Sequence, residues 1–247
     1  MKPENHEFIP EPDIGTDRMK QLQRQISRKA VFEDKFDFDL NADDLTVAGV
    51  DQAFTKSRSV SVAIAMKNGK IIEEESAAEE VPMPYIPGLL AFREGSSIVS
   101  TLKKLDVEPD MLLLDGSGRI HFRQAGIATH IGVIFDVPAI GVAKNLLCGK
   151  VDLPGKMQQG NKRKVHADSS VENLDETVIG YAYQSRQYSS PKQSINPLYI
   201  SPGHRVNVET SVNIVSRFCK DYKLPEPIQI ADSKVSQVKK EYSTNSV

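Results

Sequence analysis

Val47-Ala48-Gly49-Val50-Asp51 lies in the first of three consecutive strand-like stretches, and this part of the sequence decides the fold. The stretches are Thr46–Phe54, Ser59–Met66 and Lys70–Ser76. The second alternates apolar and polar residues, and Asn68-Gly69 before the third is a strong hairpin signal. Three strands joined by short turns predict an antiparallel meander.

The pattern then changes to alternating helices and strands. Met111–Leu114 is short and wholly apolar, as expected for a buried parallel strand. The neighbouring predicted elements are a helix at Phe92–Leu105, a helix at Gln124–Asp136 and a strand at Val137–Val142. An antiparallel meander followed by right-handed βαβ units predicts a mixed central sheet flanked by helices, an α/β fold.

The flanking segments complete one predicted domain over residues 16–247, preceded by a flexible tail over residues 1–15. Helical spacing of apolar residues predicts helices at Asp17–Phe36, Val208–Tyr222 and Ile228–Tyr242. Extended segments are expected at Glu176–Tyr183 and Leu198–Ser201. Residues 149–175, rich in Gly, Lys, Gln and Ser, are predicted to form a loop.

Composition indicates a soluble, cytoplasmic protein. A chain of 247 residues with 26% charged residues holds no apolar run of the roughly 20 residues that a membrane helix needs, and the polar N-terminus lacks the apolar core of a signal peptide. Cys148 and Cys219 are far apart, which fits a reducing compartment and argues against a zinc site. With a net charge of -2, nucleic-acid binding would need a local basic face. Residues 162–164 could supply one, although a solvated loop is an equal alternative.

Three carboxylates each lie where an apolar element meets a glycine-bearing turn: Asp51, Glu94 and Asp115. A carboxylate after a buried strand carries a desolvation cost. Acids on three separate elements could converge on a divalent metal, and such a site suits phosphodiester hydrolysis. Each acid also has a purely structural alternative. Asp51 could pair with a lysine at the strand end, and Glu94 could interact only with the dipole at the start of its helix. Asp115 could belong to an Asp-Gly turn, which is common without function.

The segment Pro84-Tyr85-Ile86-Pro87-Gly88 predicts a rigid loop that presents Tyr85 and Ile86. A stiff aromatic-aliphatic wedge can unstack a base step, although such a loop can also simply pack on its own domain. Lys144 follows a predicted strand on the same sheet edge as Asp115 and could bind a phosphate, or be a surface lysine. His204 could touch a phosphate or organise its turn, and His121 with Arg123 could face nucleic acid.

These residues together resemble the endonuclease V family, the deoxyinosine-specific endonucleases. The matching stretches run in order over roughly residues 16–240. They are Val47–Asp51, Pro84–Glu94, Leu113–Gly118, Gly126–Val133, Ile140–Gly149, Ser201–Arg205, and Leu224–Pro227 with Ala231-Asp232. The block from Pro84 to Glu94 has no common look-alike, so the match is specific. Ile120 and Phe122 depart from the alanine and proline that the family often has beside the histidine and arginine of this loop.

The resemblance implies a ribonuclease H-like fold and a Mg²⁺ site, with Mn²⁺ able to substitute. Implied metal ligands are Asp51, Asp115, Asp232 and Glu94, with Lys144 binding the phosphate. Implied substrate contacts are the strand-separating loop at Tyr85, Ile86 and Pro87, a hypoxanthine pocket at Gly88, Leu90, Gly116 and Leu147, and His121 and His204 nearby. The expected protein is a monomeric DNA repair enzyme that cuts the second phosphodiester 3′ to the deaminated base.

Three alternatives stay open at this level. A different metal-dependent nuclease on the same fold would share the acids but lack the wedge and pocket. A catalytically silent nucleic-acid binder would have no need of Asp51, Glu94, Asp115 and Lys144 together. Inosine in RNA, instead of DNA, is a substrate alternative within the same family, because contacts to the 2′-hydroxyl cannot be read from the sequence.

Overall fold

The computed structural model describes residues 1–11, 14–40, 42, 44–81, 83–174, 177–187 and 195–244. Its centre is an eight-stranded sheet in the order β3-β2-β1-β4-β5-β8-β7-β6. The strands are β1 Thr46–Phe54, β2 Arg58–Lys67, β3 Lys70–Glu80, β4 Met111–Asp115, β5 Ala139–Ala143, β6 Lys162–His166, β7 Val178–Tyr183 and β8 Leu198–His204. The helices are η1 His6–Phe8, α1 Thr16–Lys29, α2 Leu90–Lys104, α3 Ile127–Phe135, α4 Val208–Phe218 and α5 Glu226–Thr244.

The direction of the strands brings three chain segments to one edge of the sheet. β1, β4 and β5 run parallel, so their C-terminal ends lie together. Val50 pairs with Leu114, which places Asp51 beside Asp115 one residue further along. Asp115 in turn pairs with Val142, two residues before Lys144. The remaining neighbours in the sheet are antiparallel. This mixed sheet confirms the predicted α/β, ribonuclease H-like fold.

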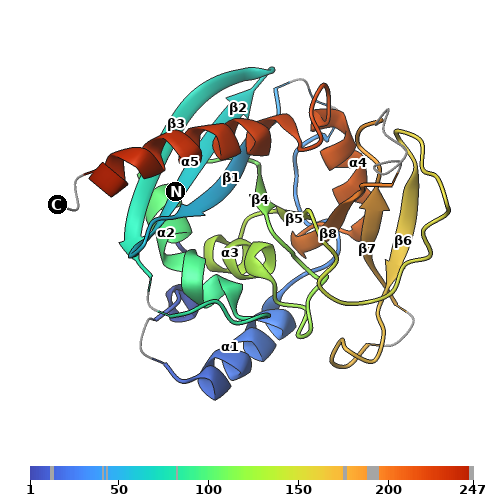
Figure 1. Ribbon diagram of the computed structural model, residues 1–247, viewed down its shortest axis with the longest axis horizontal. Coiled ribbons are helices and arrows are strands. Elements are labelled where there is room, and N and C mark those ends of the chain that lie inside the picture. Colours follow the sequence, from blue (N-terminus) through green and yellow to red (C-terminus); the bar gives the residue numbers. More distant parts are fainter. Residues whose placement is uncertain are drawn as a thin grey trace.

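Two helical layers cover the sheet (Figure 1). α2 and α3 pack on one face and α1 packs against α3, so that Ile26, Ile98 and Ile131 join a core cluster with Val50 and Leu114. α4 and α5 pack on the other face. There the core residues include Val47, Leu113, Val142, Val215 and Ile228. In Figure 1, α5 runs across β1, β2 and β3. A sheet covered on both faces explains why the first four residues of β4, Met111–Leu114, are all apolar and buried.

The loop predicted over residues 149–175 contains strand β6, and that part of the prediction was wrong. Lys162–His166 pairs with β7 at the outer edge of the sheet, and only Val165 of this strand is buried. Edge strands commonly carry charged residues, so an apolar pattern is absent and the strand is hidden in the sequence. The predicted strand Glu176–Tyr183 begins outside the described residues and is found from Val178.

The N-terminal segment, predicted to be loose, makes specific contacts in its described part. The Met1 ammonium group donates to the carbonyl oxygen of Leu105, and Asn5 donates through its side chain to that of Val133. Phe8 is buried in the same cluster as α3. His130 of α3 bonds to the Phe8 carbonyl oxygen at 2.8 Å. Residues 1–9 therefore cover one end of the α2–α3 layer.

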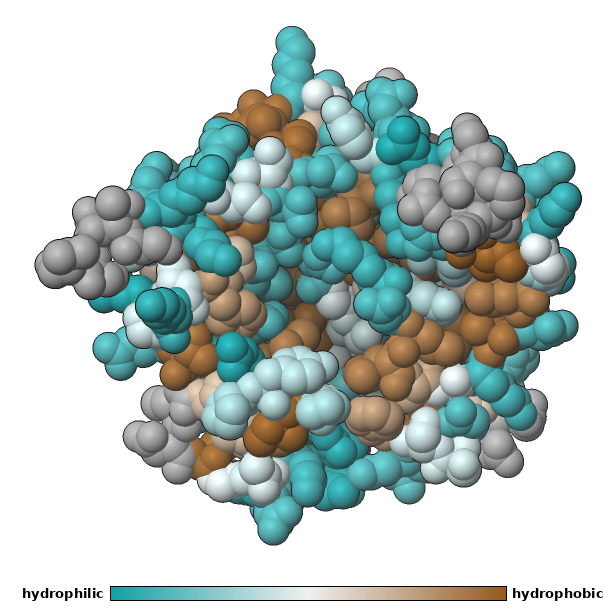
Figure 2. Space-filling view, viewed as in Figure 1, coloured by the Kyte–Doolittle hydropathy of each residue, from teal (hydrophilic) through white to brown (hydrophobic). Residues whose placement is uncertain are grey.

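Hydrophilic residues cover most of the face seen in Figure 2, with hydrophobic ones gathered in patches between them. Among the residues that the structure describes, no helix has both the length and the apolar character required to span a bilayer.

Candidate metal centre and base pocket

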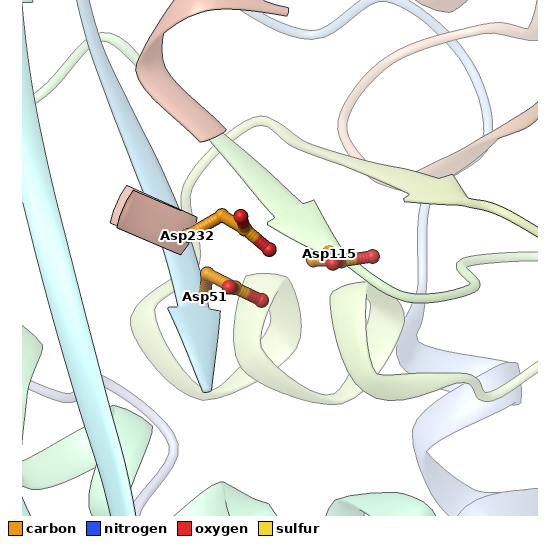
Figure 3. Close-up of side chains that lie close together, drawn as sticks. All are labelled: Asp51, Asp115 and Asp232. Carbon is orange, nitrogen blue, oxygen red and sulfur yellow. The ribbon is translucent and has the colours of Figure 1, made fainter. Parts of the chain in front are cut away.

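Three carboxylates meet at the sheet edge where β1 and β4 end (Figure 3). Asp51 ends the buried part of β1, Asp115 is the last residue of β4, and Asp232 comes from α5. One oxygen of each lies within 4.8 Å of an oxygen of the others. Hard carboxylate oxygens on rigid elements at this spacing form a donor set suited to Mg²⁺ or a similar divalent ion.

The approach of α5 to the sheet depends on Gly49. A Cβ atom at this position would lie 2.2 Å from the backbone carbon of Pro227, at the start of α5. Any side chain there would push the helix away from β1, because atoms cannot approach so closely. The glycine in the Val-Ala-Gly-Val-Asp stretch thus lets α5 bring Asp232 to the other two acids.

The cluster brings carboxylates together at a partly buried position, where negative charge is unfavourable. Burial, and then the neighbouring Asp115, raise the pKa of Asp51 to about 8. Lys144 offsets part of this charge, since its Nζ lies 2.7 Å from Asp115 Oδ2 and 3.6 Å from Asp232 Oδ1. Burial disfavours the charged lysine, but the carboxylates outweigh this and raise the pKa of Lys144. A bound cation would relieve the repulsion between carboxylates this close together, so the residues present suit the implied metal.

Glu94 lies beside this cluster without belonging to the group of three. It projects from the first turns of α2, is buried, and lines the same cavity as Asp51. Burial raises its pKa to about 8; Arg93 opposes this, and Asp115 adds to it. Among the described residues, the oxygens close enough to share one ion come from the three aspartates.

A cavity of about 530 Å³ opens next to the carboxylates. Six of the residues predicted to bind substrate line it: Tyr85, Gly88, Leu90, Gly116, His121 and Leu147. Its wall also includes Asp51, Glu94, Asp115 and Lys144. Gly116 has φ 150°, and a Cβ there would lie 2.5 Å from Ile127 Cγ2. Only glycine therefore lets the backbone lie this close to Ile127 in the cavity wall. The cavity combines a partly apolar pocket with the acidic cluster, as a nucleobase next to its phosphate requires.

The loop at Pro84–Gly88 forms a type II turn that presents a single aromatic ring. Leu89 N–H donates to the Ile86 carbonyl oxygen at 3.0 Å, with Pro87 and a Gly88 of φ 77° between them. Tyr85 is 61% exposed, so its ring stands out from the surface. Ile86, predicted to project beside it, instead packs in the cluster that contains Met19, Leu89 and Phe92.

The two predicted histidines lie in different surroundings. His121 is buried in the cavity wall, and its Nε2 lies 3.0 Å from the Gly88 carbonyl oxygen. His204 pairs with Ala139 at the opposite end of β5 from the acids. It is buried and bonded through both ring nitrogens, to Asp136 and to the Val31 N–H. The substrate contact predicted for His204 does not fit this placement. The ring is buried and both of its nitrogens are already hydrogen-bonded within the protein, so the residue has a structural role.

The structure brings further residues to the site that the sequence analysis did not identify, and Gln23 and Lys223 are two examples. Gln23 of α1 lines the cavity, although its helical spacing marks it only as part of a buried helix face. Lys223 donates to Asn196 at 2.6 Å and interacts electrostatically with Lys144 and Asp115. Burial and then Lys144 lower its pKa. A lysine between two helices carries no motif, so only the folded structure reveals it.

The comparisons with known proteins agree with this geometry. The family model described as Endonuclease V matches residues 21–233. Endonuclease V of Haloarcula marismortui is 47% identical over 263 residues, covering 96% of this chain and 97% of the relative.

Two solved structures have the same fold. Endonuclease V of Streptomyces avermitilis superposes with a TM-score of 0.80 at 27% identity, covering 93% of this chain and 95% of that one. Endonuclease V of Ciona intestinalis, solved with a 24mer DNA containing an inosine followed by a ribo-adenosine, gives 0.73 at 25% identity, covering 92% and 98%. By these matches, and by the acidic cluster and cavity that agree with them, the chain belongs to the endonuclease V family, phosphodiester-hydrolysing nucleases that cleave DNA 3′ to deoxyinosine.

Proposed function

We propose that this member of the endonuclease V family is a Mg²⁺-dependent repair enzyme that cuts the second phosphodiester 3′ to deoxyinosine and leaves a 3′-hydroxyl and a 5′-phosphate. The observation that carries the proposal is the convergence of Asp51, Asp115 and Asp232 beside a cavity large enough to admit a base. The Ciona relative, crystallised with inosine-containing DNA, supports the choice of lesion.

Asp51, Asp115 and Asp232 are the proposed metal ligands, with Glu94 beside them. A divalent ion bound there would polarise the attacking water and stabilise the charge on the leaving 3′ oxygen. Lys144 is proposed to hold the scissile phosphate, because its ammonium group lies at the acidic cluster and its side chain is 43% exposed. As a point charge on a flexible stem, it can move from Asp115 to an incoming phosphate.

The cavity is the proposed site for the flipped hypoxanthine. Hypoxanthine differs from adenine by a ring N–H and by a carbonyl in place of the amine. The backbone N–H of Gly88 and the backbone groups of Gly116 are proposed to discriminate these edges, since a wrong partner leaves buried polar groups unpaired. Leu90 and Leu147 supply apolar contact with the face of the base.

Tyr85 is proposed to enter the stack in place of the departing base. Extrusion of a base costs a few kcal/mol, and less where pairing is already weak. An aromatic ring on a proline-stiffened turn can fill the gap without further ordering. Below, the segment Pro84–Gly88 is called the wedge loop.

Cleavage of labelled oligonucleotides tests the proposal. Single- and double-stranded substrates carry deoxyinosine, inosine, uracil or no lesion, with Mg²⁺, Mn²⁺ or a chelator. A metal-dependent nick one nucleotide beyond the deoxyinosine is expected, and the ratio of DNA to RNA cleavage gives the preferred substrate. Cleavage that ignores the lesion, or that survives the chelator, would contradict the proposal.

A further inference from the structure

One carbonyl group at the base of the wedge loop accepts hydrogen bonds from three different side chains. The Gly88 oxygen receives Gln23 Nε2 at 2.9 Å, His121 Nε2 at 3.0 Å and Arg123 Nη2 at 3.0 Å. These donors come from α1 and from the loop after β4, so they connect segments 33 to 65 residues apart in the chain. A carbonyl oxygen has two lone pairs, and three donors on one oxygen go well beyond what burial alone demands.

The donors are also bonded to one another. Arg123 Nε donates to Gln23 Oε1 at 2.7 Å, and the Arg123 backbone N–H donates to His121 Nδ1 at 3.1 Å. The latter bond makes Nδ1 an acceptor and leaves the proton on Nε2, where it points at Gly88. Burial, and then Arg123, lower the pKa of His121 to about 3, which keeps the ring neutral and this tautomer in place. The three side chains therefore form one connected network, named here the Gly88 clamp.

The opposite end of the wedge loop is held as well. Arg93 donates through Nη1 to the Met83 carbonyl oxygen at 2.7 Å, and its guanidinium lies 4.4 Å from the centre of the Phe54 ring. Between these two fixed carbonyls the tip carries Tyr85, which is the exposed part. The loop is thus anchored at both ends, with the aromatic ring free in the middle.

The base pocket shares a wall with this clamp. Gln23 and His121, two of the three donors, line the cavity together with Gly88, whereas the third donor, Arg123, is not among its lining residues. This oxygen is fully engaged inside the protein, so its role is structural and not recognition of the base. A flexible loop would be displaced when it meets stacked bases and would not separate them. Anchoring fixes the position of the loop before the substrate binds.

We propose that Gln23 and Arg123 are positioning residues that hold the wedge loop rigid, so that Tyr85 can separate a paired and stacked lesion. The inference rests on the proposed function, because it assigns a device to the proposed wedge. It implies that the clamp matters most where the base must be forced out. Duplex substrates need this force, and single strands need it less.

The test compares Gln23→Ala with Gln25→Ala, a glutamine on the exposed side of the same helix. The quantity measured is kcat/KM for deoxyinosine in duplex DNA divided by kcat/KM for deoxyinosine in single-stranded DNA. Gln23→Ala is expected to lower this ratio on the order of tenfold relative to Gln25→Ala. Gln23→Glu retains a partner for Arg123 but cannot donate to the Gly88 oxygen, so it is expected to lower the ratio too.

An equal loss on both substrates, or a ratio like that of Gln25→Ala, would overturn the proposal. Thermal unfolding shows which variants are folded, and Arg123→Lys reports on the clamp if Gln23→Ala is not. Tyr85→Ala separates the two ideas. If it leaves the ratio unchanged, the proposed wedge itself fails; if it lowers the ratio and the clamp variants do not, only the clamp fails. A wild-type protein that ignores deoxyinosine would contradict the proposed function before either comparison.

Discussion

Asp51 is buried, so its protonation state depends on the neighbouring charged groups. Its pKa is raised from 3.8 to about 8 by burial and by Asp115. Between these values the folded protein keeps a proton that the unfolded chain has lost. The metal-free protein therefore loses stability as the pH rises through this window, and a bound cation restores it.

Asp51→Asn is expected to raise the free energy of unfolding of the metal-free protein by on the order of 1 kcal/mol at pH 8, because it removes a buried charge. The same change should abolish the stabilisation by Mg²⁺. Thermal unfolding with Mg²⁺ and with a chelator, at pH 6 and pH 8, measures both effects. A variant that is still stabilised by Mg²⁺ as strongly as the wild type would remove Asp51 from the ligand set.

Asp115→Ala is expected to reduce cleavage of deoxyinosine DNA by at least about 10³-fold while leaving lesion binding largely intact, since the base pocket lies beside the carboxylate. Gel cleavage gives the first quantity, and fluorescence anisotropy with labelled DNA gives the second. Retained cleavage would take Asp115 out of the metal site. Asp110, which caps β1 through the Thr46 N–H at the other end of β4, offers a matched aspartate for comparison.

Single residues were predictable where strand patterns surround them. Asp51 and Asp115 each follow a run of buried residues, so the sequence placed them at the edge of a sheet. Asp232 lies on a helix with no local pattern, and only the family resemblance pointed to it. Gln23 acts through Gly88 and Arg123, partners 65 and 100 residues away, and no local window of sequence holds that information.

Among the elements, the contact between β1 and α5 controls the site most directly. Gly49→Ala is expected to push α5 outward, because the new methyl group would overlap the backbone of Pro227. We expect a loss of roughly 2–3 kcal/mol of stability and a larger loss of metal-dependent cleavage, since Asp232 moves with the helix. Gly155→Ala, with open space around the position, is the control. Wild-type Mg²⁺ activation in Gly49→Ala would contradict this coupling.

Elements were predictable in proportion to the regularity of their pattern. β1 was predicted with its bounds as found, because most of its residues are apolar and the polar stretch Thr55–Arg58 follows. α3 is shorter than predicted because Gln124 and Asp136, at the predicted ends, both have φ 52° and leave the helical region. β6 was missed because only one of its residues, Val165, is buried, so this edge strand has no apolar alternation in its sequence.

At the scale of the whole molecule, the N-terminal segment and α3 meet at a histidine that cannot take a second proton without loss. His130 Nε2–H donates to the Phe8 carbonyl oxygen, and among the described residues Nδ1 is buried with no partner. Burial lowers its pKa to about 4. The unfolded chain protonates near pH 6.5, so this contribution to stability is complete above that value and is lost as the pH falls toward 4.

The contribution of His130 to the free energy of unfolding is therefore expected to fall by on the order of 1–2 kcal/mol between pH 7 and pH 5. Asp51 and Glu94 act in the opposite direction, because their raised pKa values stabilise the folded protein as the pH falls. His130→Gln retains a donor for Phe8 but cannot be protonated, so its acid sensitivity should be smaller. Urea denaturation at both pH values measures the difference. His121, Asp51 and Glu94 keep their own contributions in both proteins, so the difference between wild type and His130→Gln at each pH isolates His130.

The three aspartates also order events in time. Asp51 and Asp115 are in the first half of the chain, whereas Asp232 is in the last helix, which must dock on β1 to deliver it. A nascent chain on the ribosome can thus form most of the sheet and even the wedge while it still lacks a ligand. On the proposed ligand set, the nuclease becomes competent to cut only after α5 has been made and has docked on β1, so a molecule that stops before this helix cannot nick the genome of the cell that is making it.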